Sequence, residues 1–112
     1  MNCIFCKIIA GEIPSSKAYE DEYCYCFHDI NPQAPIHVLV VPKLHIPSTD
    51  GINADNSIYV SKIFEAIPAI AAELGLGDGY RVITNCGENG CQSVHHLHFH
   101  VLGGKKLPEN MG

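Results

Sequence analysis

Three histidines that alternate with apolar residues form the part of this sequence best suited to chemistry. Segment 95–102, His-His-Leu-His-Phe-His-Val-Leu, contains four of the seven histidines of the chain. Strict alternation is typical of a β-strand with two unlike faces, and it predicts that His96, His98 and His100 share one face. Imidazoles two residues apart on a strand lie about 6–7 Å from each other. Such a row suits metal binding, phosphate binding or nucleophilic catalysis.

The neighbouring residues leave more than one chemistry open. A purely structural role is disfavoured, because each buried imidazole needs two hydrogen-bond partners. Two alternating histidines with a third from elsewhere, His37 or His45, could hold a catalytic zinc ion that Asp29 helps to orient. Loop 85–93 instead favours phosphate chemistry, since its glycines permit positive φ, its amides can form an anion-binding nest and Ser93 adds a hydroxyl. A histidine beside such a loop can attack phosphorus.

The hydrophobic pattern predicts an α+β fold with an antiparallel sheet of about five strands, one long helix and one short helix. We expect the short helix at 3–10 and the long helix at 53–74, with Pro68 kinking the latter or breaking one of its hydrogen bonds. The apolar stripe of the long helix is predicted to contain Val60, Ile63, Phe64, Ile67, Ile70, Ala71 and Leu74. Strands are expected at 17–19, 23–28, 37–41, 79–84 and 95–102.

Composition narrows the class of protein. The 112 residues predict a single domain, 1–112, and the formal net charge of −5 argues against binding to a nucleic-acid backbone. No apolar run reaches the roughly 18 residues of a membrane span, and the N-terminus does not have the order of a signal peptide. We therefore expect a cytoplasmic protein without a membrane partner, in which the six cysteines serve as metal ligands or free thiols.

Segment 96–102 resembles the motif of the histidine triad family, in which three histidines alternate with apolar residues. The resemblance covers nearly the whole chain and is carried by segments 4–14, 27–37, 41–46, 92–94 and 96–104. Leu102-Gly103-Gly104 is similar to the Hint branch rather than to the Fhit branch of dinucleotide hydrolases. Two features depart from the Hint pattern: Cys91 stands where glycine or alanine is usual, and the chain has no tryptophan.

The resemblance implies a hydrolase of purine nucleoside 5′-phosphoramidates that cleaves the P–N bond. His98 is the implied nucleophile, which forms a covalent nucleotidyl-histidine before water releases AMP or GMP. The implied catalytic residues are His37, Ser93, His96, His98 and His100. The implied substrate-binding residues are Asp29, Ile30, Asn85, Cys91, Gln92, Ser93, His98 and His100. The family also implies a homodimer with one sheet extended across both subunits, while His95 is expected to take no part in the chemistry.

A second site is indicated by Cys3-x-x-Cys6, which has the spacing of zinc ligands. The resemblance implies that His45 and His96 complete a closed, structural zinc site. Cys24 and Cys26 have no evident ligand partner in the sequence. Two other functions remain open: a dinucleoside polyphosphate hydrolase or nucleotidyltransferase with the same nucleophile, and a non-catalytic nucleotide-binding zinc module.

Overall fold

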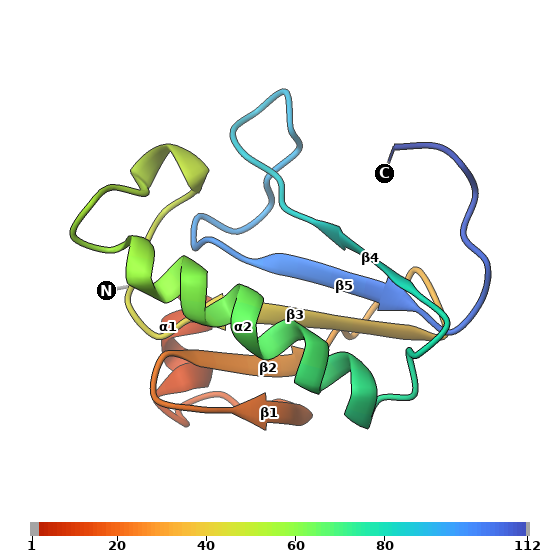
Figure 1. Cartoon of the computed structure of the whole chain (residues 1–112). Helices are drawn as coiled ribbons and strands as arrows, with labels where there is room; N and C mark the ends of the chain where they lie inside the picture. The colour runs from red at the N-terminus through yellow and green to blue at the C-terminus, as the bar shows by residue number, and fades with distance from the viewer. Residues whose placement is uncertain (1–2, 112) are drawn as a thin grey trace.

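The computed structural model describes residues 3–111, so Met1, Asn2 and Gly112, at the two ends of the predicted domain, lie outside the described residues. Five strands and two α-helices form an α+β fold, as predicted (Figure 1). In chain order the elements are α1 (Ile4–Ile9), β1 (Lys17–Glu20), β2 (Cys24–His28), β3 (Ile36–Pro42), a 3₁₀ turn η1 (Thr49–Gly51), α2 (Ser57–Glu73), β4 (Tyr80–Ile83) and β5 (Phe99–Gly103). Neither α-helix is long and apolar enough to cross a membrane.

The sheet is antiparallel throughout and has the strand order β1-β2-β3-β5-β4. β3 is central, between β2 and β5, and its Val38 and Val40 are fully buried. Its apolar run Val38-Leu39-Val40-Val41, in which three of the four residues are β-branched, suits a strand that is covered on both faces. β3 therefore pairs on one side with β2, from the first part of the chain, and on the other side with β5, which contains His100.

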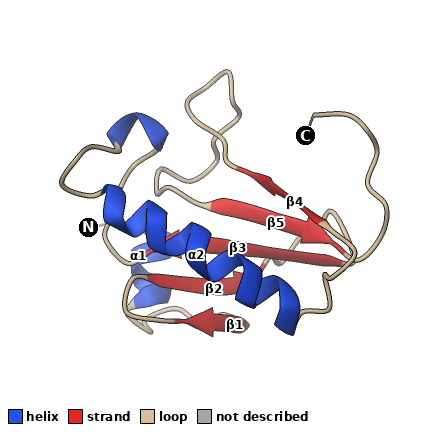
Figure 2. Cartoon of the chain, in the orientation of Figure 1, coloured by secondary structure: helices blue, strands red, loops and turns tan. Residues whose placement is uncertain are grey.

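The two helices cover opposite faces of the sheet (Figure 2). α2 lies over one face, where Leu97, Phe99 and Val101 enter the larger core. α1 lies on the other face and packs Phe5 and Ile8 onto β2 and β3. Alternate residues of the histidine segment thus point to different cores, as the alternation predicts.

The strand predicted at 95–102 is shorter than expected and begins only at Phe99. The ladder with β3 ends at the Val40–Phe99 pair, and that with β4 ends at Ile83–His100. Upstream of this point the backbone bonds to other partners: Leu97 N donates to Ile46 O at 2.6 Å, and Thr84 Oγ1 donates to His98 O at 2.8 Å. The alternating pattern therefore extends past the strand into a segment that bends at residues 94–96.

The long helix begins at Ser57 rather than at Asn53. The Oδ1 atom of Asn53 accepts the N–H groups of Asp55 and Asn56, and such asparagine turns compete with helix formation. The helix is continuous through Pro68, which is exposed, so the carbonyl group that lacks a donor there lies toward solvent. Phe64, predicted in the buried stripe, is instead 48% exposed and packs its ring edge-on against Phe99.

Candidate functional site

The ring orientations of His96 and His98 follow from acceptors on the backbone. His98 Nδ1 lies 2.7 Å from the carbonyl oxygen of His96, and His96 Nε2 lies 2.9 Å from that of Pro42. A carbonyl oxygen only accepts, so each of these nitrogens carries the proton. The neutral His98 ring therefore has its lone pair on Nε2, whereas the neutral His96 ring has its lone pair on Nδ1. His98 Nε2 is free to act as a nucleophile.

A second pair of rings orients His100. The backbone N–H of Gln33 donates to His37 Nδ1 at 3.0 Å, so His37 carries its proton on Nε2. This nitrogen lies 2.9 Å from His100 Nδ1 and donates to it, which places the proton of neutral His100 on Nε2. Burial lowers the pKa of His37, and burial together with the neighbouring His98 and His37 lowers the pKa of His100 to about 4. His100 is thus neutral near pH 7 and presents an N–H group.

His98 and His100 both line a cleft of about 560 Å³ between α1 and the end of β2. Their ring centroids are 5.1 Å apart. The cleft is bordered by Ile4, Phe5, Ile8, Pro14, Ser15, Ser16, Phe27, His28, Asp29, Ile30, Leu39, Ser93, Val94, His98 and His100. Apolar walls with a few polar groups are typical of a binding site for a small organic molecule.

Asp29 and Ile30 border this cleft, as the resemblance implies. Asp29 Oδ1 accepts the N–H of Asn31 at 2.8 Å and closes a turn, while Oδ2 lies 3.5 Å from His37 Nε2. The carboxylate thus has one oxygen in a turn and the other beside the pair of rings that orients His100. Ile30 is 93% exposed at the rim of the cleft.

Of three other predicted substrate-binding residues, Asn85 and Cys91 make their contacts inside loop 85–93, and Gln92 also bonds outside it. Asn85 Nδ2 donates to Gly90 O at 2.8 Å, and the N–H of Cys91 donates to Glu88 O at 3.0 Å. Cys91 is exposed and has a φ of 61°, which is uncommon outside glycine. The side chain of Gln92 bonds to Pro47 O at 2.7 Å, Val94 O at 3.0 Å and the N–H of Gly87 at 3.1 Å.

Within the described chain, Ser93 borders the cleft, whereas Asn85, Cys91 and Gln92 do not. Their bonds hold the loop closed, and a β-carbon on Gly90 would lie 2.4 Å from Cys86 O. The N–H groups of Gly87, Cys91 and Gln92 all donate within the loop. The predicted anion-binding nest is therefore not formed by these three amides in this conformation.

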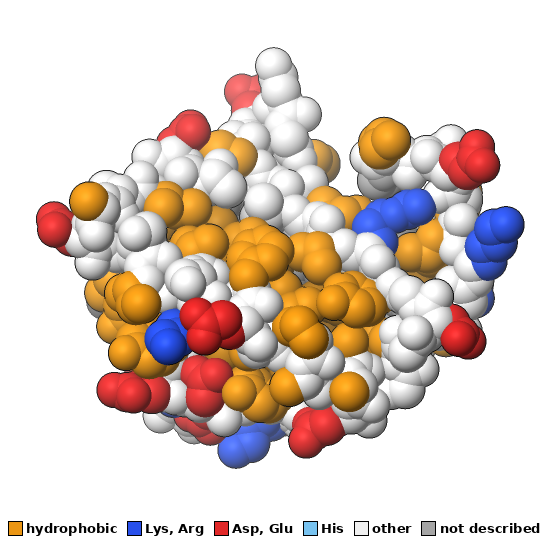
Figure 3. All heavy atoms as spheres, viewed as in Figure 1, with side chains coloured by type: hydrophobic (Ala, Val, Ile, Leu, Met, Phe, Trp, Pro, Cys, Tyr) orange, Lys and Arg blue, Asp and Glu red, His pale blue; other side chains and the backbone are white. Residues whose placement is uncertain are grey.

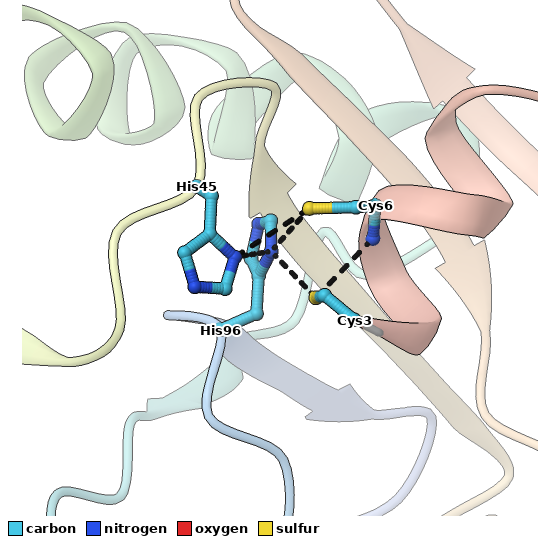
Figure 4. Close-up of side chains that lie close together, drawn as sticks. All are labelled: Cys3, Cys6, His45 and His96. Carbon is cyan, nitrogen blue, oxygen red and sulfur yellow. Dashed lines mark hydrogen bonds between the residues drawn. The ribbon is translucent and has the colours of Figure 1, made fainter. Parts of the chain in front are cut away.

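The residues predicted to hold zinc converge on one point (Figure 4). His96 Nδ1 lies 3.3 Å from Cys3 Sγ, 3.6 Å from Cys6 Sγ and 3.1 Å from His45 Nδ1, and Cys6 Sγ lies 3.5 Å from His45 Nδ1. Zinc binds sulfur at about 2.3 Å and nitrogen at about 2.0 Å, so ligand atoms around one tetrahedral ion lie roughly 3.3–3.8 Å apart. The three sulfur–nitrogen separations lie in this range, and the 3.1 Å between the ring nitrogens of His45 and His96 lies just below it, so the four side chains suit one tetrahedral ion after a small adjustment of the rings.

The surroundings of His96 also suit a metal ligand. Its Nε2–H donates to Pro42 O, which leaves the Nδ1 lone pair directed at the two sulfur atoms. Asp29, His37 and His100 form another group of possible metal ligands, but their ring lone pairs are not directed at one point. The two rings are joined by a direct hydrogen bond, so their facing nitrogens share one proton instead of directing two lone pairs at an ion.

Sequence reasoning missed the groups that orient the histidines. The Pro42 carbonyl, the Gln33 N–H and the Thr84 hydroxyl are separated from their partners by long stretches of chain or carry no periodic signal. Phe5 lies in the short helix expected at 3–10, and its ring packs edge-on against His98, with centroids 5.1 Å apart. The expectation of a helix did not show which residues its side chains contact.

The chain thus combines an antiparallel sheet, one helix on each face and a row of histidines of which two line an apolar cleft. The HIT domain family matches residues 10–107, and the chain belongs to this family. Protein HitA of Neisseria gonorrhoeae is 45% identical over 91% of this chain and 95% of its own length. The 14 kDa zinc-binding protein of Zea mays is 46% identical over 93% of this chain and 83% of its own length.

Solved structures agree with this assignment. A histidine triad protein from Clostridium difficile superposes with a TM-score of 0.94 at 53% identity, covering 98% of this chain and 96% of its own. A HIT family hydrolase from Legionella pneumophila also has a TM-score of 0.94, at 41% identity, covering 99% of this chain and 100% of its own. The α+β fold with its antiparallel sheet and two helices is that of HIT family proteins.

Proposed function

We propose that the protein hydrolyses purine nucleoside 5′-phosphoramidates through a covalent intermediate on His98, and that it releases AMP or GMP. The observation that carries the proposal is the orientation of His98. Its Nδ1–H donates to the His96 carbonyl, which leaves the lone pair of Nε2 available to attack phosphorus. The position of this ring at one end of an apolar cleft and the hydrolase among the solved relatives support it.

In the first step His98 Nε2 attacks the α-phosphorus, a P–Nε2 bond forms and the bond from phosphorus to the leaving amine breaks. The amine takes a proton from His100 Nε2. In the free protein the pKa of His100 is about 4, and the negative charge of a bound phosphate raises it toward the protonated form. In the free protein His37 Nε2–H holds the neutral His100 ring through the 2.9 Å bond to Nδ1. Protonation of His100 adds a proton at Nδ1, so this bond opens, and Nδ1 keeps its proton after Nε2–H has passed to the amine.

In the second step a water molecule attacks the phosphorus of the nucleotidyl-histidine. His100, neutral after the first step, accepts the proton of this water at Nε2 as the new P–O bond forms. The P–Nε2 bond breaks, and its electron pair stays on His98 Nε2, which restores the starting enzyme. Ser93, at the same end of the cleft, supplies a hydroxyl donor to the phosphate oxygens.

The apolar part of the cleft is the proposed nucleoside site. Ile4, Phe5, Ile8, Phe27 and Leu39 provide surfaces for a purine ring, and Asp29 offers Oδ2 as an acceptor to the ribose hydroxyls. Asn85, Cys91 and Gln92 act by closing the loop that carries Ser93. This role replaces the direct contacts that the resemblance implies for them.

Cys3, Cys6, His45 and His96 are proposed to hold a structural zinc ion. All four ligand positions come from the protein, so the ion offers no open position for substrate and its chemistry is to cross-link α1, the segment after β3 and the triad. The zinc-binding relative from Zea mays is consistent with this site.

We also propose that the protein forms a homodimer and that it works in a reducing compartment. β4 is an edge strand, and hydrophobic side chains gather on the face that carries α2, where Phe64, Ile58 and Tyr80 are at least 40% exposed (Figure 3). Pairing of β4 with a second copy would extend the sheet and cover such surface. The six cysteines, all among the described residues, form no disulfide with one another, which suits the cytoplasm.

The test is turnover of an adenosine 5′-phosphoramidate by the wild-type protein and two variants. His98→Ala removes the nucleophile and is expected to abolish release of AMP, while His95→Ala, which changes an exposed neighbouring histidine, keeps it. Diadenosine polyphosphates serve as the competing substrates. Full activity of His98→Ala would disprove the mechanism, and faster turnover of the polyphosphates would assign the protein to the other hydrolase class.

A further inference from the structure

Helix α1 takes part in both sites. Cys3, at its N-cap, and Cys6 provide two of the four metal ligands, while Ile4, Phe5 and Ile8 border the cleft. A helix of six residues is far too short to be stable by itself in water. Its position therefore depends on the groups that bind it, and the metal site is one of them.

Phe5 connects the metal site to the nucleophile. It lies between the two cysteine ligands in the sequence, is 6% exposed, and packs edge-on against His98 at a centroid distance of 5.1 Å and an interplanar angle of 86°. The same ring contacts His96 at 5.9 Å and Phe27 at 5.5 Å. A shift of α1 would thus move one wall of the cleft and one side of the His98 ring together.

The segment after β3 makes a second connection. His45 faces the metal site, the carbonyl of Ile46 accepts the N–H of Leu97 at 2.6 Å, and the carbonyl of Pro47 accepts Gln92 Nε2 at 2.7 Å. Leu97 lies between two triad histidines, and Gln92 closes the loop that carries Ser93. Fixing His45 therefore fixes both the triad backbone and the phosphate end of the cleft.

From these contacts we infer that the metal site is an effector site of the nucleotide cleft and that Phe5 is the positioning residue that couples them. Zinc fixes α1 and segment 45–47, which preforms the purine wall and the ring position of His98. Because coupling between two ligands is reciprocal, bound nucleotide tightens zinc by the same factor. The inference rests on the proposed nucleotide and zinc sites, and goes beyond them by linking their affinities.

The experiment measures the two affinities against each other. AMP binding is followed by calorimetry on zinc-loaded and zinc-free protein, and zinc binding by competition with a chromophoric chelator in the presence and absence of AMP. We expect each ligand to tighten the other by about fivefold or more, within the usual range for coupled sites. A measurement that needs no zinc-free protein is the rate of zinc release to excess chelator, which saturating AMP should slow by a similar factor.

Phe5→Leu separates coupling from simple metal binding. This variant keeps all four metal ligands, so zinc binds in the absence of AMP, but the effect of AMP on zinc should fall below about twofold. Tyr59→Leu, which removes a ring from α2 on the opposite face of the sheet, is the matched control and should retain full coupling.

Three outcomes would overturn the inference, and they are distinguishable. Equal AMP affinity with and without zinc removes the coupling and leaves the proposed nucleotide function intact. Absence of AMP binding in both forms contradicts the nucleotide function itself. Absence of zinc binding by the wild-type protein contradicts the metal site.

Discussion

At the scale of single residues, His37, His96 and His98 are each oriented by a backbone group that has only one hydrogen-bonding role. Carbonyl oxygens fix the rings of His96 and His98, and the amide of Gln33 fixes His37, which in turn fixes His100. Three chemically identical side chains thereby present different groups: His96 an Nδ1 lone pair, His98 an Nε2 lone pair and His100 an Nε2–H. The proposed division of tasks among metal binding, attack on phosphorus and proton transfer rests on these partners.

Replacing His100 with alanine tests its proposed role as a proton donor. General acid catalysis is usually worth about 10²–10⁴-fold, so we expect kcat for an alkylamine phosphoramidate to fall by such a factor. An adenosine phosphate ester with an acidic phenol leaving group needs little protonation and should lose far less. Equal losses for both substrates in steady-state assays would show that His100 does not protonate the leaving group.

The lowered pKa of His100 also predicts how stability depends on pH. Its folded value of about 4 lies below the unfolded value of about 6.5, so between them the unfolded chain binds more protons and stability rises with pH. Acidification from pH 7 to pH 5 should therefore lower the urea midpoint more in the wild type than in His100→Asn, whose side chain does not titrate. Comparing the two proteins at each pH cancels any effect of metal loss that they share. An equal fall of the urea midpoint in the wild type and in His100→Asn would contradict the pKa shift.

At the scale of elements, sequence periodicity predicted each helix and strand, but it did not predict where some of them end. β3 has a run of apolar residues that identifies it, whereas the start of β5 depends on where β3 and β4 stop pairing with it. The start of α2 was set by asparagine side chains that bond to nearby N–H groups. Boundaries fixed by partners distant in sequence, or by local side-chain bonds, leave no periodic signal.

The candidate site, like the fold, could be predicted only in part from the sequence. The triad and Cys3-x-x-Cys6 follow from motifs with fixed spacing, whereas the resemblance implied His45 and His96 as the other metal ligands. The structure brings these four side chains together, and it places His98 and His100 in one cleft. The side-chain bonds of Asn85 and Gln92 depend on how loop 85–93 folds, which a motif does not encode. The contact of Phe5 with His98 depends on how α1 docks on the sheet.

Metal removal tests how strongly α1 depends on zinc. A ligand present at one hundred times its dissociation constant stabilises the folded state by about 2.7 kcal/mol, which corresponds to roughly 10 °C in Tm for a domain of this size. A strong chelator should lower the Tm of the wild type by about this amount and leave a Cys3→Ser, Cys6→Ser variant unchanged. Differential scanning calorimetry with matched chelator concentrations gives the comparison, and an unaffected wild type would exclude a stabilising metal.

At the scale of the whole molecule, the exposed apolar face and the free edge of β4 predict a dimer. Sedimentation equilibrium should give twice the mass of the chain for the wild type. Phe64→Glu places a charge on a side chain that is 48% exposed and should shift the equilibrium toward the monomer. Lys62→Glu, on the same helix, is the control for a new negative charge, and monomeric wild-type protein at micromolar concentration would contradict the prediction.

The central claim is that His98 becomes covalently bonded to the nucleotide, and mass spectrometry of the trapped intermediate tests it most directly. The protein is mixed with an adenosine 5′-phosphoramidate, quenched within milliseconds without acid, and digested for peptide analysis. We predict an adenylyl group on His98 that appears before AMP accumulates and is absent from His98→Ala. Rapid release of AMP by the wild type with no adduct on His98 at any time, or an adduct on another residue, would contradict the account.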